Sequence, residues 1–389
     1  MKRIVLPALS LFITASLGAL DYGMLLTQQL EATDARVSTP SLSDDVNSYT
    51  VGVEPRFSMI FGDSADLYIS ARMTINTSRE PLFIPELMRS EYSLRHNKLM
   101  ISLGRMPYTA PFEYVVNGLF DGVKASFYYP FGTLYCGLWY TGLLYKNEAN
   151  IVITDDDKHA YLEPVDYGRF DETYFASRRL VGALGWEHPS VAGIFSAKTA
   201  FIFQIDLNGA DENSGAPLNS QYIMARFSLP YRNLSFQLGG ILQTAETEGE
   251  TSAGFTCDMG LSCYLPVGVT SLLSLTGHFS LDNGKSAVPN LIPINSKSFG
   301  RITDISPSGI SAFTLDYSVR ISAVFSAMAG ILGYIQNDLP EQSGRKGCEI
   351  YAQMTWAPLS DIMVNLGGGY DISSDPKWKI NVLMTLSIL

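Results

Sequence analysis

The sequence has few charges, few cysteines and, beyond its N-terminus, no long apolar run. Charged residues make up 17% of the 389 positions, against roughly a quarter in an ordinary soluble domain. A helix that crosses a bilayer needs about twenty apolar residues in succession, so the sequence excludes a helical membrane protein. The cysteines lack metal-type C-x-x-C spacing, and Cys257 and Cys263 would lie too far apart on one strand for a disulfide.

Basic residues and histidines are also scarce. The 27 Lys and Arg against 38 Asp and Glu argue against a nucleic-acid partner, because phosphate contacts need basic surfaces. Only four histidines occur, and the one acid–histidine cluster, Asp155 to Asp157 with His159, lies in a long link. We interpret this cluster as a solvated face, with loose divalent-cation binding as the alternative. No zinc, nucleotide or nucleophile motif occurs, so we expect no enzyme, no cofactor and no bound metal.

Hydrophobic residues are plentiful, at 46%, and they are dispersed by alternation. From Val269 to Leu281 apolar residues take mostly the odd positions, and the same period of two runs through 362–371 and 378–388. This period is typical of strands and not of helices. Strands of this length match a tilted crossing of a bilayer.

The connections between these strands alternate in length. Strands are predicted at 21–30, 48–60, 66–77, 88–95, 98–105, 122–130, 132–143, 176–187, 196–205, 219–229, 233–245, 251–264, 268–282, 311–321, 323–336, 347–357, 360–371 and 378–388. Tight turns alternate with mostly longer polar links such as 144–175 and 283–310. We therefore predict an all-β fold: a transmembrane, antiparallel, up-and-down β-barrel of about 18 strands, with short periplasmic turns and long extracellular loops.

Aromatic residues are predicted to mark the short-turn rim, because amphipathic rings settle at the headgroup level. The five residues that support this rim are Tyr129, Tyr231, Tyr264, Trp356 and Trp378.

The N-terminus reads as an export signal. Lys2 and Arg3 precede an apolar stretch, and small residues near 18–19 offer a cleavage site, so residues 1–19 are predicted to be a signal peptide. Residues 20–389 are predicted to form a single barrel domain in the cell outer membrane. The expected partners are outer-membrane lipid and the barrel-assembly machinery for insertion, and a homo-oligomer is left open.

The strand faces that point away from lipid carry the charged residues. The early strands are predicted to place Arg56, Arg72, Arg89, Arg95, Lys98 and Lys124 inward, with Glu54 and Glu91 among them. The late strands are predicted to place Asp258, Asp316, Glu349 and Asp371 inward, with Arg320. A basic face opposite an acidic one would orient or select charged solutes. The alternative is that these charges pair with their neighbours and only hydrate the interior.

The link 106–121 is too apolar for a loop that extends into solvent, since it contains Tyr108, Phe112, Tyr114 and Phe120. We expect it to fold into the lumen and narrow the pore, which would bring Glu113 and Asp121 toward the basic residues. The alternatives are that it packs over the mouth of the barrel or continues a neighbouring strand.

The chain resembles a bacterial outer-membrane porin, in which the loop after the fifth strand constricts the lumen and opposes a row of basic residues. Link 106–121 has the matching place, and Arg56, Arg72, Arg89 and Arg95 are the candidates for the row. A weaker likeness, through 103–105 and 118–123, is to alginate-export and related eighteen-stranded channels. The C-terminus departs from many such barrels, because it ends in Leu389 and not in an aromatic residue.

The resemblance implies passive diffusion of small hydrophilic solutes through the barrel. The alternative is a surface-exposed barrel whose loops, such as 144–175, act in adhesion or partner binding.

Overall fold

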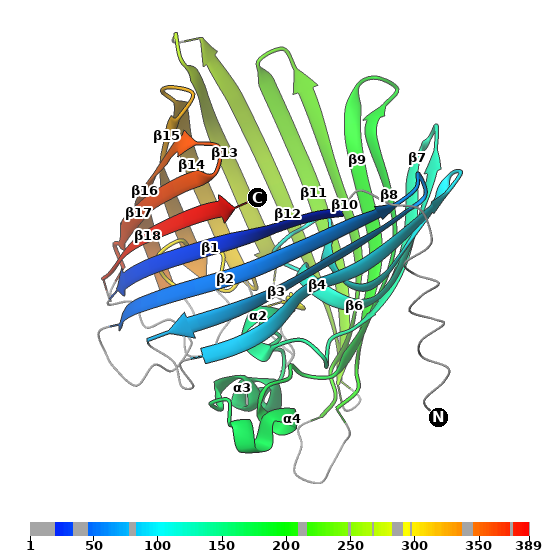
Figure 1. Cartoon of the computed structure of the whole chain (residues 1–389). Helices are drawn as coiled ribbons and strands as arrows, with labels where there is room; N and C mark the ends of the chain where they lie inside the picture. The colour runs from blue at the N-terminus through cyan, green and yellow to red at the C-terminus, as the bar shows by residue number, and fades with distance from the viewer. Residues whose placement is uncertain are drawn as a thin grey trace, which may run out of the picture.

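The computed structural model describes residues 20–33, 46–77, 83–208, 216–247, 250–266, 268–281, 291–295, 298–336, 345–373 and 376–388. The predicted signal peptide lies outside these residues. The described strands form one closed antiparallel sheet of 18 strands, in which each strand pairs with its neighbours in sequence and β1 also pairs with β18 (Figure 1). The all-β barrel prediction is therefore confirmed, including the strand count.

Every predicted strand overlaps one observed strand. The observed strands are β1 (Leu20–Thr33), β2 (Val46–Phe61), β3 (Ala65–Asn76), β4 (Phe83–His96), β5 (Leu99–Thr109), β6 (Asn117–Tyr129), β7 (Gly132–Tyr140), β8 (Arg179–Val191), β9 (Phe195–Asp206), β10 (Asn219–Tyr231), β11 (Leu234–Thr247), β12 (Glu250–Pro266), β13 (Thr270–Leu281), β14 (Ile310–Arg320), β15 (Phe325–Gln336), β16 (Arg345–Leu359), β17 (Ile362–Asp371) and β18 (Lys377–Ile388).

The outer surface of the barrel is apolar. Alternate strand residues expose large apolar side chains, among them Ile69, Met73, Leu103, Leu138, Leu184, Ile223, Leu242, Leu275, Leu315, Ile350 and Ile380. A soluble protein rarely exposes a continuous apolar surface of this extent. In a bilayer this surface contacts lipid, so the free-energy cost of exposing it to water is avoided. Closure of the sheet leaves no strand edge in the hydrocarbon.

The exposed aromatic residues correct one sequence prediction. Tyr129, Tyr231, Tyr264 and Trp356 are exposed next to short turns, as expected. Trp378 is also exposed, but it begins β18 and so lies at the opposite end of the barrel. The prediction was wrong for this residue because the link 372–376 belongs to the long-loop end.

The end of β5 and the start of β6 lie off the barrel wall. β5 pairs with β4 only as far as Arg105, and β6 pairs with β7 only from Asp121. Beyond these positions, residues 106–109 and 117–120 pair with each other and with no wall strand among the described residues. The link predicted at 106–121 is thus mostly a continuation of the β5–β6 hairpin, whose tip is the short loop 110–116.

Two cross-strand glycines allow the hairpin to bend away from the wall. Gly104 and Gly122 are register partners. Gly104 has a φ of 104°, and a Cβ there would lie 2.0 Å from the carbonyl oxygen of Ser90. A Cβ on Gly122 would lie 2.1 Å from the carbonyl oxygen of Leu138. Only glycine fits such a conformation and such close backbone approaches.

Segment 141–178 fills the gap that the hairpin leaves in the wall. Residues 83–87 of β4 pair with β3 on one side only. On the other side the carbonyl oxygens of Phe83, Pro85 and Leu87 accept hydrogen bonds from the Tyr167 hydroxyl, the Tyr174 hydroxyl and the Arg105 guanidinium. These donors satisfy carbonyl groups of a strand edge that pairs with no strand on this side.

The same segment contains the helices of the described chain: α2 (Lys146–Ala149), α3 (Asp155–Leu162), the 3-10 turn η1 (Tyr167–Arg169) and α4 (Phe170–Thr173). They lie together at one end of the barrel (Figure 1). None of these helices has the length and apolar character needed to cross a membrane.

The acidic run at 155–157 is the first turn of α3 and not part of an irregular loop. Thr154 and Asp157 form a capping box, in which each side chain accepts from the other residue's backbone N–H. Carboxylates also interact favourably with the N-terminal end of a helix.

The ammonium group of Lys146 in α2 donates to the carbonyl oxygens of Ala160 and Glu163, at 2.7 Å each. Burial lowers the pKa of this lysine.

Candidate functional site

The hairpin tip 110–116 extends into the lumen and reaches β10, β11 and β12. Phe112 packs against Gly239 of β11, since a Cβ on that glycine would lie 2.6 Å from the ring. The Tyr114 hydroxyl donates to Oδ2 of Asp258 in β12 at 2.9 Å. The Arg226 guanidinium of β10 donates to the carbonyl oxygen of Pro111 at 3.3 Å. The tip therefore lies inside the barrel and is fixed to the far wall.

A hydrophobic cluster occupies the space between the hairpin and the β7–β11 wall. Its members include Met106, Tyr108, Phe112, Phe120, Tyr135, Trp139, Ile202, Tyr222, Met224, Ile241, Leu291 and Ile294. Val115 and Val116 of the tip are fully buried in it. The lumen beside β7–β11 is therefore packed with apolar side chains, as in the core of a soluble protein.

A second segment, the inner segment 298–309, covers the inner face of β14–β16. Its residues Ile302 and Ile305 pack against Leu332 and Tyr351 of the wall. Glu349 of β16 is fully buried beneath it and accepts the backbone N–H groups of Arg301 and Thr303 at 2.6 and 2.8 Å. Glu349, predicted to line the lumen, is thus enclosed beneath this segment.

The inner faces of β1–β4, β17 and β18 stay outside both clusters, as far as the described residues show. Arg56, Arg72 and Arg89 lie on three neighbouring strands of this face, and their side chains are between 29% and 39% exposed. These three arginines are therefore partly open to the interior of the barrel.

Carboxylates are interleaved with these arginines. Glu54 accepts from both Arg56 and Arg72 at 3.0 Å, and Arg72 also lies 3.7 Å from Glu148 of α2. Arg89 pairs with Glu91 at 2.5 Å. The face is therefore a row of alternating charges that pair with their neighbours, the arrangement that the sequence left open as the alternative to a basic face opposite an acidic one.

The other predicted basic residues are spread along the early strands. Arg95 is exposed near the end of β4, and Lys98 lies in the turn after it, with its ammonium 5.7 Å from the ring centroid of Tyr129. Lys124 of β6 lies over the ring of Tyr135 at 5.1 Å. These three residues do not join the Arg56–Arg89 row.

The predicted acidic partners lie apart from the row as well. Asp121 forms an ion pair with Arg105 at 2.8 Å where the hairpin leaves the wall. Asp316 accepts from the Tyr351 hydroxyl at 2.6 Å. Glu113 is exposed on the hairpin tip, and no ion pair connects it to a basic wall residue of the described chain.

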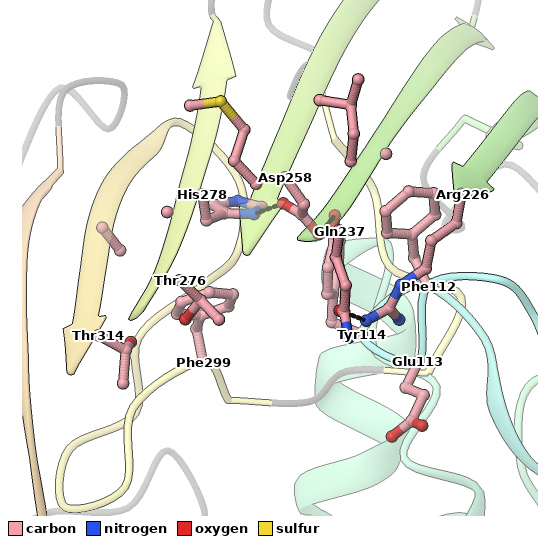
Figure 2. Close-up of a pocket in the computed structure, with 15 residues that line it drawn as sticks. Phe112, Glu113, Tyr114, Arg226, Gln237, Asp258, Thr276, His278, Phe299 and Thr314 are labelled. Carbon is pink, nitrogen blue, oxygen red and sulfur yellow. Dashed lines mark hydrogen bonds and ion pairs between the residues drawn. The ribbon is translucent and has the colours of Figure 1, made fainter. Parts of the chain in front are cut away.

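A cavity of about 320 Å³ lies beside the tip, where it meets strands β10–β14 (Figure 2). Phe112 and Tyr114 of the tip, Asp258 and His278 of the wall, and Phe299 of the inner segment are among the residues that line it. Glu113 points away from Asp258 and His278 (Figure 2). The cavity thus lies where the tip, the inner segment and the wall meet.

Sequence reasoning missed three residues that position the tip: Arg105, Arg226 and His278. Arg105 donates to the carbonyl oxygens of Leu87 and Leu143 in addition to Asp121. An available signal was the pair of glycines, Gly104 and Gly122, that flanks an apolar stretch and marks the bend.

Comparison with known proteins identifies similar structures only. No protein-family model matches the sequence, and no curated protein does. Among solved structures, the outer membrane protein OpdK of Pseudomonas aeruginosa is 11% identical, with a TM-score of 0.64 over 95% of this chain and 98% of that one. OccK2 (OpdF) of the same organism is 10% identical, with a TM-score of 0.66 over 95% and 97%.

OpdQ of Pseudomonas aeruginosa covers even more of both chains, 96% of this one and 99% of its own, at 11% identity and a TM-score of 0.61. At such identities the likeness establishes the fold and not the solute. The chain has the architecture of an eighteen-stranded, porin-type outer-membrane barrel.

Proposed function

We propose that the chain is an outer-membrane channel that lets small hydrophilic solutes diffuse along the charged face of β1–β4, with the hairpin tip 110–116 as its constriction. The observation that carries this proposal is the division of the lumen. One side is packed with apolar side chains, whereas the half-exposed Arg56, Arg72 and Arg89 remain accessible on the other. Water and ions can enter only a polar passage of this kind.

The similar structures support the same interpretation, because one of them, OpdK, is described as an outer membrane protein. We further propose that residues 20–389 form the single barrel domain, that residues 1–19 direct its export, and that the barrel-assembly machinery inserts it with its short turns in the periplasm. No cofactor has a role in such diffusion.

The proposal is tested by solute flux into proteoliposomes. The purified barrel should pass small sugars and amino acids, at rates that fall steeply as the solute grows, since diffusion through a narrow pore is limited by size. Liposomes that contain heat-denatured protein are the control. A folded barrel that passes none of these solutes would refute the channel.

Replacing Arg72 by Gln should make the pore less selective for anions. Arg72 is the arginine that Glu54 and Glu148 share, so its loss leaves Glu148 without this partner and makes the field along the face more negative. We expect the anion-to-cation permeability ratio, measured from the reversal potential in a salt gradient, to fall by roughly a factor of two.

Arg232→Gln is the matched control. Arg232 is exposed in the turn between β10 and β11, so its substitution removes the same positive charge outside the passage. An equal shift in both variants would mean that Arg72 acts through the total charge of the protein and not through the passage.

The alternative function, a surface barrel whose loops bind a partner, has less support from the geometry. Segment 141–178, which includes the longest candidate loop, is held to the barrel by the hydroxyl groups of Tyr167 and Tyr174 and by the buried Arg179. A segment with these contacts serves first as part of the barrel.

A further inference from the structure

Two lumenal segments meet at one pair of wall residues. Asp258 of β12 and His278 of β13 are register partners, and their side chains approach within 2.6 Å (Figure 2). The second carboxylate oxygen of Asp258 accepts from Tyr114 of the hairpin tip at 2.9 Å. Nε2 of His278 lies 3.0 Å from the carbonyl oxygen of Pro307 in the inner segment. Asp258 and His278 thus join the tip to the inner segment.

The proton count at His278 follows from these contacts. Both ring nitrogens face oxygen atoms, one a carboxylate and one a backbone carbonyl, and neither of these oxygens can donate a hydrogen bond. A neutral imidazole has one N–H, so one of the two contacts would bring a nitrogen lone pair against an oxygen lone pair. An imidazolium donates to both. The contacts therefore hold one proton more than a neutral imidazole beside a carboxylate supplies.

The surroundings of the ring supply one full negative charge. His278 is 2% exposed, and Asp258 is the carboxylate in contact with it. The tip presents the Tyr114 ring at 5.2 Å, the inner segment presents the Phe299 ring at 4.7 Å, and β14 presents Ala312 as register partner. Of the other charged residues at the cavity, Glu113 points away and Arg226 is held by Gln237 at 2.8 Å.

We propose that Tyr114, Asp258, His278 and the Pro307 carbonyl form a proton-dependent clasp that holds the constriction in place. When His278 loses its proton, the remaining N–H stays on the Asp258 carboxylate and the hydrogen bond to the Pro307 carbonyl is lost. This loosens the inner segment, and with it the Phe299 ring that packs against Tyr114 of the tip at 6.1 Å. The tip then leaves the β10–β12 wall more often, and its position beside the passage is no longer fixed. This inference rests on the proposed function for its consequence in transport, but not for the contacts that it describes.

Hydrogen exchange of the purified full-length barrel in detergent measures how firmly the clasp holds the tip. Exchange of the tip peptide, corrected for the intrinsic rate, is measured at about pH 5.5 and about pH 8.5, a range in which histidine changes its charge. In the wild type we expect the tip to exchange roughly tenfold faster at the higher pH, the effect of losing one hydrogen bond to a charged group. His278→Gln should remove this dependence.

Asp258→Asn gives the sharper result because it should reverse the dependence. The amide oxygen can still accept from Tyr114, and the amide N–H₂ can donate to an unprotonated Nδ1 of His278. A neutral ring then donates through Nε2 to Pro307, so all contacts are complete without the extra proton. We expect this variant to protect the tip better at about pH 8.5 than at about pH 5.5. The substitution preserves the shape of the side chain, so the barrel should fold.

His159→Gln on the exposed surface of α3 is the matched control and should keep the wild-type dependence. The clasp is refuted if wild-type exchange is equal at both pH values, if His278→Gln keeps the dependence, or if Asp258→Asn shows the wild-type direction. A pH-dependent tip in a barrel that passes no solute would refute the channel and leave the clasp standing. Solute flux through a barrel whose tip exchanges equally at both pH values would refute the clasp and leave the channel standing.

Discussion

Replacing residues 110–116 by Asn-Gly should raise the single-channel conductance roughly twofold or more, since the tip spans the lumen and conductance follows the open cross-section. Thr109 and Asn117 are register partners, so a two-residue Asn-Gly turn can close the shortened hairpin without strain. The variant removes Phe112 and Tyr114, which contact the opposite wall. Planar-bilayer recording in symmetric salt measures the change.

The matched control places Asn-Gly at Pro130 and Phe131, the turn between β6 and β7, which lies at the end of the wall and not in the lumen. Its conductance should equal that of the wild type. Both variants are first checked for assembly by far-ultraviolet circular dichroism. An unchanged conductance in a correctly assembled tip variant would show that the constriction lies elsewhere.

Arg179→Ala should destabilise the barrel by about 3–5 kcal/mol, the typical cost of leaving buried charges without their partner. The guanidinium lies 2.5 Å from Asp157 of α3 and 3.0 Å from Asp206 of β9, and all three side chains are at most 3% exposed. Its loss leaves two buried carboxylates facing each other, and it also releases α3 from the wall. Urea unfolding monitored by tryptophan fluorescence measures the change in the free energy of unfolding.

Arg169→Ala is the control for this result. Arg169 also pairs with several carboxylates, among them Glu163 and Asp166, but its partners and its own side chain are exposed. Exposed pairs contribute little to stability, so this variant should unfold like the wild type. Adding Asp157→Asn and Asp206→Asn to Arg179→Ala should recover part of the loss. No recovery would mean that packing, and not charge, explains the cost.

Strand number and order could be predicted because both depend on local patterns. Alternation along a strand and the lengths of connections are visible in sequence, and they determined even the weakly patterned β15, Phe325–Gln336. The same kind of reading could have found α3, because Thr154 and Asp157 stand three residues apart in a capping box. The long polar link around them concealed this signal.

The departure of the hairpin from the wall could not be predicted in detail. It depends on which residues of β5 and β6 lose their neighbours, and this is decided by contacts distant in sequence, such as Arg105 with Leu143 and Phe112 with Gly239. The pairs of Arg56 with Glu54 and of Arg89 with Glu91 lie two residues apart on one strand, so only the contact of Arg72 with Glu54 needed the register of β2 and β3. For the hairpin and for the charged residues alike, the sequence alone left more than one arrangement open.

The clasp could be predicted from the sequence only in part. Asp258 and His278 each lie ten residues from Gly268, in the turn between their strands, so a tight turn makes them partners. That the tip also reaches them from across the lumen could not be known from the sequence. Local pattern thus predicts the scaffold, whereas the site depends on where the lumenal segments fold.

The most direct test of the central claim is planar-bilayer recording of the purified wild-type barrel. The structure predicts discrete conductance steps, one for each inserted barrel, with a conductance well below that of the Asn-Gly tip variant. A folded barrel that inserts and yet gives no conductance above that of the bare bilayer would contradict a channel along the Arg56–Arg89 face.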